Sequence, residues 1–65
     1  MKKGIIIEHT LVDNFDGADI HKRPEIVPNT CVNVIGHGVF YGIAYTKIEY
    51  ENIVGYVDSK CIVEI

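Results

Sequence analysis

Short runs of branched and aromatic residues alternate with turn residues along the second half of the chain. The runs at 30–35, 39–46 and 52–57 consist mainly of such residues, and a last apolar run covers 61–65. This pattern is typical of strands that place one face on a core, so we predict four strands there. The turns predicted between them are 36–38, 47–51 and 58–60.

The first 28 residues divide into a strand and a long loop. Residues 4–12 include three consecutive Ile residues near their start and predict the first strand. Residues 13–28 contain three Asp and both Pro residues. Asp favours turns, and Pro cannot donate to a strand ladder. We therefore predict one long, mostly irregular loop over 13–28, and in so small a domain such a loop is usually functional.

Composition favours β structure throughout. The chain has eleven Ile and eight Val but one Leu and two Ala. Branching at Cβ suits a pleated sheet, whereas a helix bundle needs Leu and Ala in quantity. The 65 residues allow a single domain over 1–65. Because five short strands in a flat sheet would expose two hydrophobic edges, we predict an all-β fold, a small five-stranded barrel with one long loop after the first strand.

A series of short motifs in the second half follows the order found in a known domain family. These motifs are Val32 and Val34, Gly36, Phe40-Tyr41, Ile43-Ala44-Tyr45, Gly55-Tyr56-Val57, the turn 58–60, and Cys61-Ile62. Over residues 18–65 the chain thereby resembles bacterial Src-homology-3-like (SH3-like, SH3b-type) domains, most closely at 55–62. The resemblance implies an SH3-like barrel and, as in many bacterial members, recognition of cell-wall peptides. The chain departs from the family pattern at Phe40, where Trp is usual, and at Cys61, where Tyr is common.

The charge of the chain argues against nucleic acid as a partner. Nine acidic and six basic residues give a net charge of −3 with His neutral. Phosphate binding relies on clustered Lys and Arg, and the only basic pairs here are Lys2-Lys3 and Lys22-Arg23. We therefore predict no nucleic-acid partner.

The apolar run near the N-terminus is too short for an export or membrane signal. It covers residues 5–7, whereas a signal-peptide core needs roughly 7–15 apolar residues and a spanning helix about 20. We therefore expect no membrane association and a cytoplasmic location. In that compartment Cys31 and Cys61 are expected as reduced thiols, with a stapling disulfide as the alternative.

Three acidic residues of the long loop, Asp13, Asp16 and Asp19, leave several interpretations open. A helix-loop-helix calcium loop is excluded, because its first and twelfth positions would fall on Val12 and Arg23. An irregular calcium site, solvated turn residues, and a surface for basic ligand residues remain. The last is implied by the SH3-like resemblance, since eukaryotic relatives carry such acids in this loop.

The remaining polar residues predict neither a metal centre nor catalysis. Structural zinc sites usually place ligands in close pairs such as Cys-x-x-Cys, and the potential ligands here are spread along the chain. They are His9, His21, Cys31, His37 and Cys61. Ser59, the only serine, lies in a predicted turn, and neither Cys lies in a recognisable catalytic motif. We predict no enzymatic activity, no metal and no cofactor.

Aromatic residues are the stronger candidates for a binding site. By strand alternation Tyr41, Ile43 and Tyr45 are predicted to face inward, with Phe40 on the opposite face or packed beneath the long loop. We predict an exposed aromatic shelf beside the acidic loop, because aromatic grooves bind Pro-rich or extended peptides that lose little entropy on docking. The predicted site residues are Phe15, Phe40, Tyr50 and Tyr56, with Asp13, Asp16 and Asp19 as the adjoining acids.

Three functions follow from these expectations. The first is a stand-alone intracellular binding module, a non-enzymatic inhibitor or adaptor of the size of phage-encoded examples, that takes a protein, a peptide or a small ligand. The second is the cell-wall peptide recognition that the resemblance implies. The third is a homo-oligomeric sequestering or structural protein that associates through 5–7 and 62–65, because a domain of this size gains stability from burial between subunits.

Overall fold

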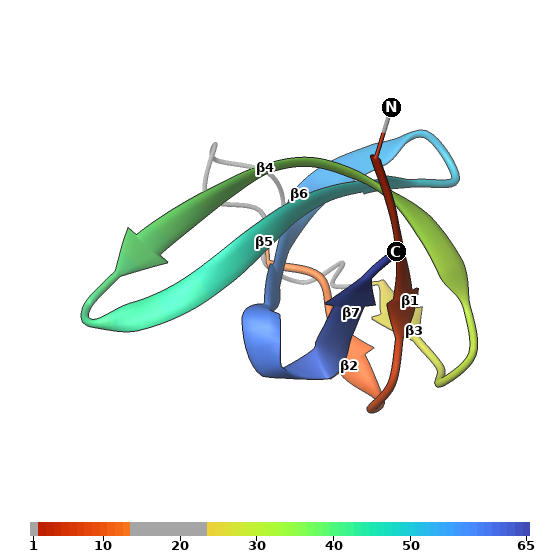
Figure 1. The fold of residues 1–65 in the computed structure, drawn as a ribbon, viewed down its shortest axis with the longest axis horizontal. Helices are drawn as coiled ribbons and strands as arrows, with labels where there is room; N and C mark the ends of the chain where they lie inside the picture. The colour runs from red at the N-terminus through yellow and green to blue at the C-terminus, as the bar shows by residue number, and fades with distance from the viewer. Residues whose placement is uncertain (1, 14–23) are drawn as a thin grey trace.

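The computed structural model describes residues 2–13 and 24–65, which form antiparallel strands joined by tight turns (Figure 1). Five strands form one sheet in the order β6-β5-β4-β1-β7, and β2 pairs with β3. The elements in chain order are β1 (Lys2–Ile6), β2 (Thr10–Leu11), β3 (Glu25–Ile26), β4 (Cys31–Phe40), β5 (Ile43–Tyr50), β6 (Ile53–Asp58), the short 3-10 helix η1 (Ser59–Cys61) and β7 (Ile62–Glu64). The predicted all-β class is confirmed.

The five-stranded sheet does not close into a barrel, so the predicted closure is wrong. Its edge strands are β6 and β7, and η1 carries the chain from one to the other. β7 has three residues, and each of them pairs with β1. Among the described residues no strand pairs with the other edge of β7, so the sheet stays open beside it.

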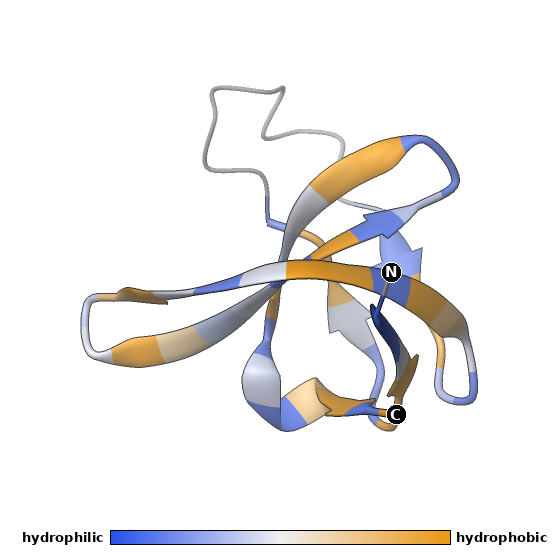
Figure 2. Cartoon of the chain, turned by 45° about the horizontal axis from the view of Figure 1, so that its top comes forward, coloured by the Kyte–Doolittle hydropathy of each residue, from blue (hydrophilic) through white to orange (hydrophobic). Residues whose placement is uncertain are grey.

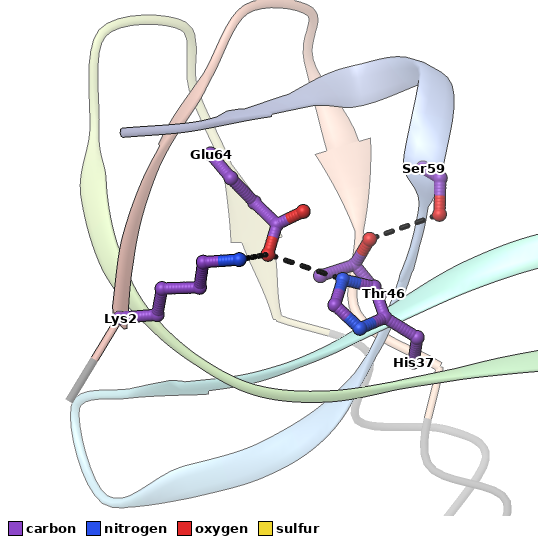
Figure 3. A network of polar contacts seen from close by, with 5 residues as sticks. All are labelled: Lys2, His37, Thr46, Ser59 and Glu64. Atoms are coloured by element: carbon purple, nitrogen blue, oxygen red, sulfur yellow. Dashed lines mark hydrogen bonds and ion pairs between the residues drawn. The ribbon is translucent and has the colours of Figure 1, made fainter.

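Side chains make contacts across the open side of the sheet (Figure 3). Glu64 Oε1 lies 3.1 Å from His37 Nε2 and 3.7 Å from Lys2 Nζ. The hydroxyl oxygens of Thr46 and Ser59 are 2.9 Å apart. These contacts link β7 and η1 to β4 and β5 without a backbone ladder.

The first predicted strand, over 4–12, is divided in two. β1 ends at Ile6, and β2 begins at Thr10. β1 pairs with β4 and β7, whereas β2 pairs with β3. The predicted irregular loop over 13–28 is therefore partly strand, because β3 gains its partner only when the chain folds back onto β2.

A β-bulge explains why the predicted turn at 36–38 is wrong. The register of β4 against β5 shifts between Val34 and Gly36. A bulge absorbs one extra residue and bends the strand without ending it. β4 therefore continues through both glycines to Phe40.

Both hairpins turn through two residues that have positive φ. The β4–β5 turn is Tyr41-Gly42, with φ of 53° and 77°, and the β5–β6 turn is Glu51-Asn52, with φ of 49° and 67°. Two-residue hairpin turns of this kind match the right-handed twist of the flanking strands. The predicted hairpin over 47–51 is wrong for most of its length, because β5 extends to Tyr50.

The hydrophobic core lies between the large sheet and the β2–β3 pair. Its buried residues are Ile6, Val12, Ile26, Val32, Val34, Ile48, Val57 and Ile62. Within β4, Val32 and Val34 are buried, but Val39 is 71% exposed because the strand has run beyond the core. Figure 2 shows hydrophobic residues at the centre of the molecule and again on the projecting β4–β5 hairpin.

A glycine in β6 lets the segment after β2 lie directly on the sheet. Asp13 and Tyr56 exchange two backbone hydrogen bonds, with N···O distances of 2.8 and 2.6 Å. A Cβ at Gly55 would lie 2.9 Å from the Asp13 carbonyl oxygen and would also collide with Val12. The absent side chain therefore allows the close approach that places Asp13 along the free edge of β6.

Candidate functional site

Three aromatic rings from neighbouring strands form a cluster on the face of the sheet opposite the core. The Phe40 ring centroid lies 5.8 Å from that of Tyr45 and 5.2 Å from that of Tyr56, the second pair in an edge-to-face arrangement. A Cβ at Gly38 would lie 3.0 Å from the Phe40 ring. Gly38 thus leaves room on β4 for the ring to lie across to β6.

A lysine adds a positive charge to one side of this aromatic cluster. Lys47 and Tyr56 are cross-strand partners in the β5–β6 ladder. The Lys47 Nζ lies 5.8 Å from the centroid of the Tyr56 ring, which is within the range of a cation–π contact. The Lys47 ammonium therefore lies beside the Tyr56 ring on the outer face.

A shallow groove adjoins the aromatic cluster where β2 meets the β5–β6 pair. It has a volume of about 370 Å³, and its lining residues are His9, Thr10, Leu11, Asp13, Tyr45 and Asp58. Tyr45 belongs both to the groove and to the aromatic cluster. Groove and cluster are therefore one continuous surface. The volume of the groove is at the small end of the usual range for ligand sites.

Two carboxylates give the groove its charge. Asp58 is the cross-strand partner of Tyr45 at the end of β6, and one of its carboxylate oxygens accepts a hydrogen bond of 2.9 Å from the Lys60 backbone N–H. This bond caps η1 and orients the Asp58 side chain. Asp13 reaches the same groove through its backbone bridge to Tyr56.

A histidine and a glutamate lie close together at the β2–β3 side of the groove. His9 Nε2 is 3.4 Å from Glu25 Oε2, and both side chains are more than half exposed (56% and 64%). Exposed pairs of this kind contribute little to stability. His9 lines the groove, so the pair lies at its rim.

The structure brings together some of the predicted site residues and separates others. Phe40 and Tyr56 are in contact, as predicted for the aromatic shelf, and Asp13 lines the adjoining groove. Tyr50 does not join them, because it packs against the hydrophobic core at the far end of β5. The other predicted site residues, Phe15, Asp16 and Asp19, lie outside the described residues.

The predicted inward face of residues 39–46 is wrong. Tyr41 is 101% exposed, Ile43 is 44% exposed, and Tyr45 belongs to the outer aromatic cluster. The prediction assumed one continuous strand through these residues. The turn at Tyr41-Gly42 instead puts Tyr41 at the apex of a hairpin and Tyr45 on a different strand from Phe40.

Several groove residues were not predicted as part of a site. They are His9, Thr10, Leu11, Tyr45 and Asp58. The pairing of Tyr45 with Asp58 follows from the register of β5 against β6. A two-residue turn at Glu51-Asn52 sets that register, so the Asn at the second turn position is the signal that could have located the pair.

Potential metal ligands and thiols are scattered over the described residues. Among residues 2–13 and 24–65, no group of three or more His, Cys, Asp or Glu side chains is placed to hold a metal ion. The same stretches contain no helix with the length and apolar character needed to cross a membrane. Cys31 is exposed and Cys61 half-buried, and both are free thiols.

No protein-family model, no curated protein and no solved structure matches the chain.

Proposed function

We propose that this protein is a non-enzymatic binding module that holds an extended peptide segment of a protein partner. The observation that carries the proposal is the continuity of the Phe40–Tyr45–Tyr56 cluster with a groove that contains Asp13 and Asp58. The bound segment has an apolar or Pro residue on the aromatic rings and a Lys or Arg residue at the carboxylates.

The chemistry of the two parts supports this ligand class. Rigid aromatic rings offer a large contact area, and extended or Pro-rich segments bind such surfaces with little loss of entropy. Carboxylates form their strongest hydrogen bonds with Arg and Lys. The two acids in the groove and the net charge of −3 disfavour a phosphate-rich partner.

The order of the strands supports an SH3-like fold as part of the same proposal. The sheet order β6-β5-β4-β1-β7 includes a one-turn connector, η1, between its two edge strands. The β2–β3 pair supports this further, because it places a paired segment between β1 and β4 where the family has its long acidic loop. On this basis the groove corresponds to the peptide-binding side of the domain.

The proposal is tested with a library of fluorescent decapeptides that vary in Pro content and in charge. Wild-type protein is expected to bind a subset that combines Pro or apolar residues with Lys or Arg. Asp58→Asn keeps an oxygen to cap η1 but removes the charge, so we expect binding of that subset to weaken about tenfold, as loss of one charged hydrogen bond predicts. Replacement of Tyr56 by Ala is expected to weaken all members of the subset.

The matched control is Glu49→Gln, which removes one negative charge from β5 outside the groove. We expect its affinities to equal those of wild type. The proposal is wrong if wild type binds no peptide of the library at millimolar concentration, or if Asp58→Asn and Glu49→Gln behave alike.

A further inference from the structure

The tip of the β4–β5 hairpin, residues 39–44, presents apolar side chains to solvent. Val39 is 71% exposed, Tyr41 101% and Ile43 44%. No charged residue occurs from position 38 to position 46. No charged side chain would therefore have to be desolvated when a partner covers this hairpin tip.

The hairpin tip projects because β4 and β5 are longer than the core they cross (Figure 1). The last buried residue of β4 is Val34, and the first buried residue of β5 is Thr46. Between them the two strands continue as a paired ribbon with the register Gly38↔Tyr45, Val39↔Ala44 and Phe40↔Ile43. Backbone pairing keeps the ribbon in shape, so the tip is a preformed, convex feature.

The residue at the apex is unfavourable for the turn that holds it. Tyr41 has φ of 53°, a left-handed conformation that Asn, Asp and Gly adopt more readily than an aromatic residue. With a side chain that is 101% exposed, Tyr41 gains almost no packing within the described part of the chain in return. Such an outlier supports a hypothesis of function at that position.

We infer that the hairpin tip inserts into an apolar cleft on a partner protein, with Tyr41 as the anchor. Exposed Tyr residues that fill a pocket on a partner are frequent centres of binding energy. The three exposed side chains offer roughly 400 Å², whereas each side of a standard interface buries about 800 Å². Two convex tips that met each other would fall short of that area, while a cleft that receives the tip also covers its flanks.

This contact is additional to the proposed groove. The hairpin tip adjoins the aromatic cluster through Phe40 but shares no residue with the groove lining. One partner is therefore able to meet both surfaces, and the two contacts are separable by substitution.

The test places a photo-reactive benzoylphenylalanine at position 41 or, as a control, at position 54. Val54 is 39% exposed on β6, away from the hairpin tip. In lysate of the organism that encodes the chain, we expect the probe at 41 to trap one protein that the probe at 54 does not trap. Mass spectrometry of the cross-linked peptide is expected to place the contact in an apolar cleft of that protein.

The trapped protein is then purified and titrated with wild type and variants. We expect Tyr41→Asn to weaken binding at least thirtyfold, although its melting temperature is equal to or above that of wild type because Asn suits the turn. Val54→Asn is expected to bind within twofold of wild type. A cross-link from position 41 to a second copy of this chain, no cross-link above that of position 54, or unchanged affinity of Tyr41→Asn would each overturn the inference.

Failure of this inference is distinguishable from failure of the proposed function. If Tyr41→Asn binds normally while Asp58→Asn binds weakly, the groove acts without the hairpin tip. If Tyr41→Asn binds weakly while Asp58→Asn binds normally, the hairpin tip is the contact and the groove takes no part in binding.

Discussion

Two hairpins share β5 and differ in what surrounds them. The β4–β5 hairpin turns at Tyr41-Gly42 and the β5–β6 hairpin at Glu51-Asn52, both with positive φ at each turn residue. The residues that flank the second turn, Tyr50 and Ile53, pack against the core. Those that flank the first turn extend beyond it, and Ile43 is 44% exposed.

The same turn geometry therefore occurs in two different surroundings within one domain. In the β5–β6 hairpin, apolar residues contribute to folding because a second layer covers them. In the β4–β5 hairpin the same kinds of residue lie outside the core, so their apolar surface stays available to a partner. Four sets of substitutions test this difference between the two hairpins.

The largest expected effect comes from the same change, Ile to Ala, made once in each half of β5. Ile48 is fully buried, so Ile48→Ala should destabilise the fold by about 3–4 kcal/mol through lost burial and a cavity. Ile43→Ala, at the hairpin tip, should cost less than about 1 kcal/mol. Urea unfolding of the two variants measures both, and equal losses would contradict the division of β5 into a core half and a projecting half.

A second test concerns the close approach of the segment after β2 to the β5–β6 hairpin. Gly55→Ala introduces a Cβ 2.9 Å from the Asp13 carbonyl oxygen, and overpacking of this kind costs about 1–3 kcal/mol. Hydrogen exchange at the Asp13 and Tyr56 amides should become faster, because their two hydrogen bonds open. The control is Gly36→Ala on β4, whose added Cβ would meet nothing closer than 3.7 Å and should leave both stability and exchange nearly unchanged.

A third test concerns the hydroxyl pair that joins β5 to η1 where the β4–β5 hairpin leaves the core. Thr46 is 2% exposed, and its hydroxyl lies 2.9 Å from that of Ser59. Ser59→Ala removes this partner from a buried polar group, which should cost about 1–2 kcal/mol. In a Thr46→Val background the same Ser59→Ala change should cost much less. Additive losses in the double variant would show that the pair does not act as a unit.

The smallest expected effect has the opposite sign. Tyr41→Asn should raise the free energy of unfolding by about 0.5–1 kcal/mol, because Asn tolerates left-handed φ better than Tyr. Glu51→Asn should give a similar gain at the other hairpin, where φ is 49°. Thermal unfolding measures both, and a loss of stability in Tyr41→Asn would mean that the Tyr41 ring packs within the chain.

Much of the scaffold could be predicted from residue types along the chain. The excess of Ile and Val predicts an all-β fold, and the strand predicted over 52–57 differs by one residue at each end from β6 (Ile53–Asp58). Phe40 and Tyr56 were predicted to share an outer surface, and their rings are 5.2 Å apart. The class and strand predictions succeeded because β-branching and alternation act within a few residues of each position, whereas the contact of Phe40 with Tyr56 depends on the pairing of strands that are distant in the chain.

The turn positions and the faces of several side chains could not be predicted in this way. The two glycines at 36 and 38 are typical of a turn, but they lie in β4, one beside a bulge and the other beneath the Phe40 ring. Tyr50 and Tyr45 have similar chemistry, yet Tyr50 packs against the core and Tyr45 lines the groove. Alternation defines two faces of a strand but does not say which face will be covered.

The β class of this protein, the approximate places of its later strands and its acidic charge follow from residue types along the chain, because these depend on the residues one at a time or with near neighbours. Three features follow only from the folded arrangement: β2 and β3 cover one face of the sheet, Tyr45, Asp13 and Asp58 meet in one groove, and the β4–β5 hairpin extends beyond the core. Each of these depends on contacts between segments distant in the chain. Burial of Val12 and Ile26 against the sheet selects its inner face, and the cluster of Phe40, Tyr45 and Tyr56 consequently lies on the opposite face.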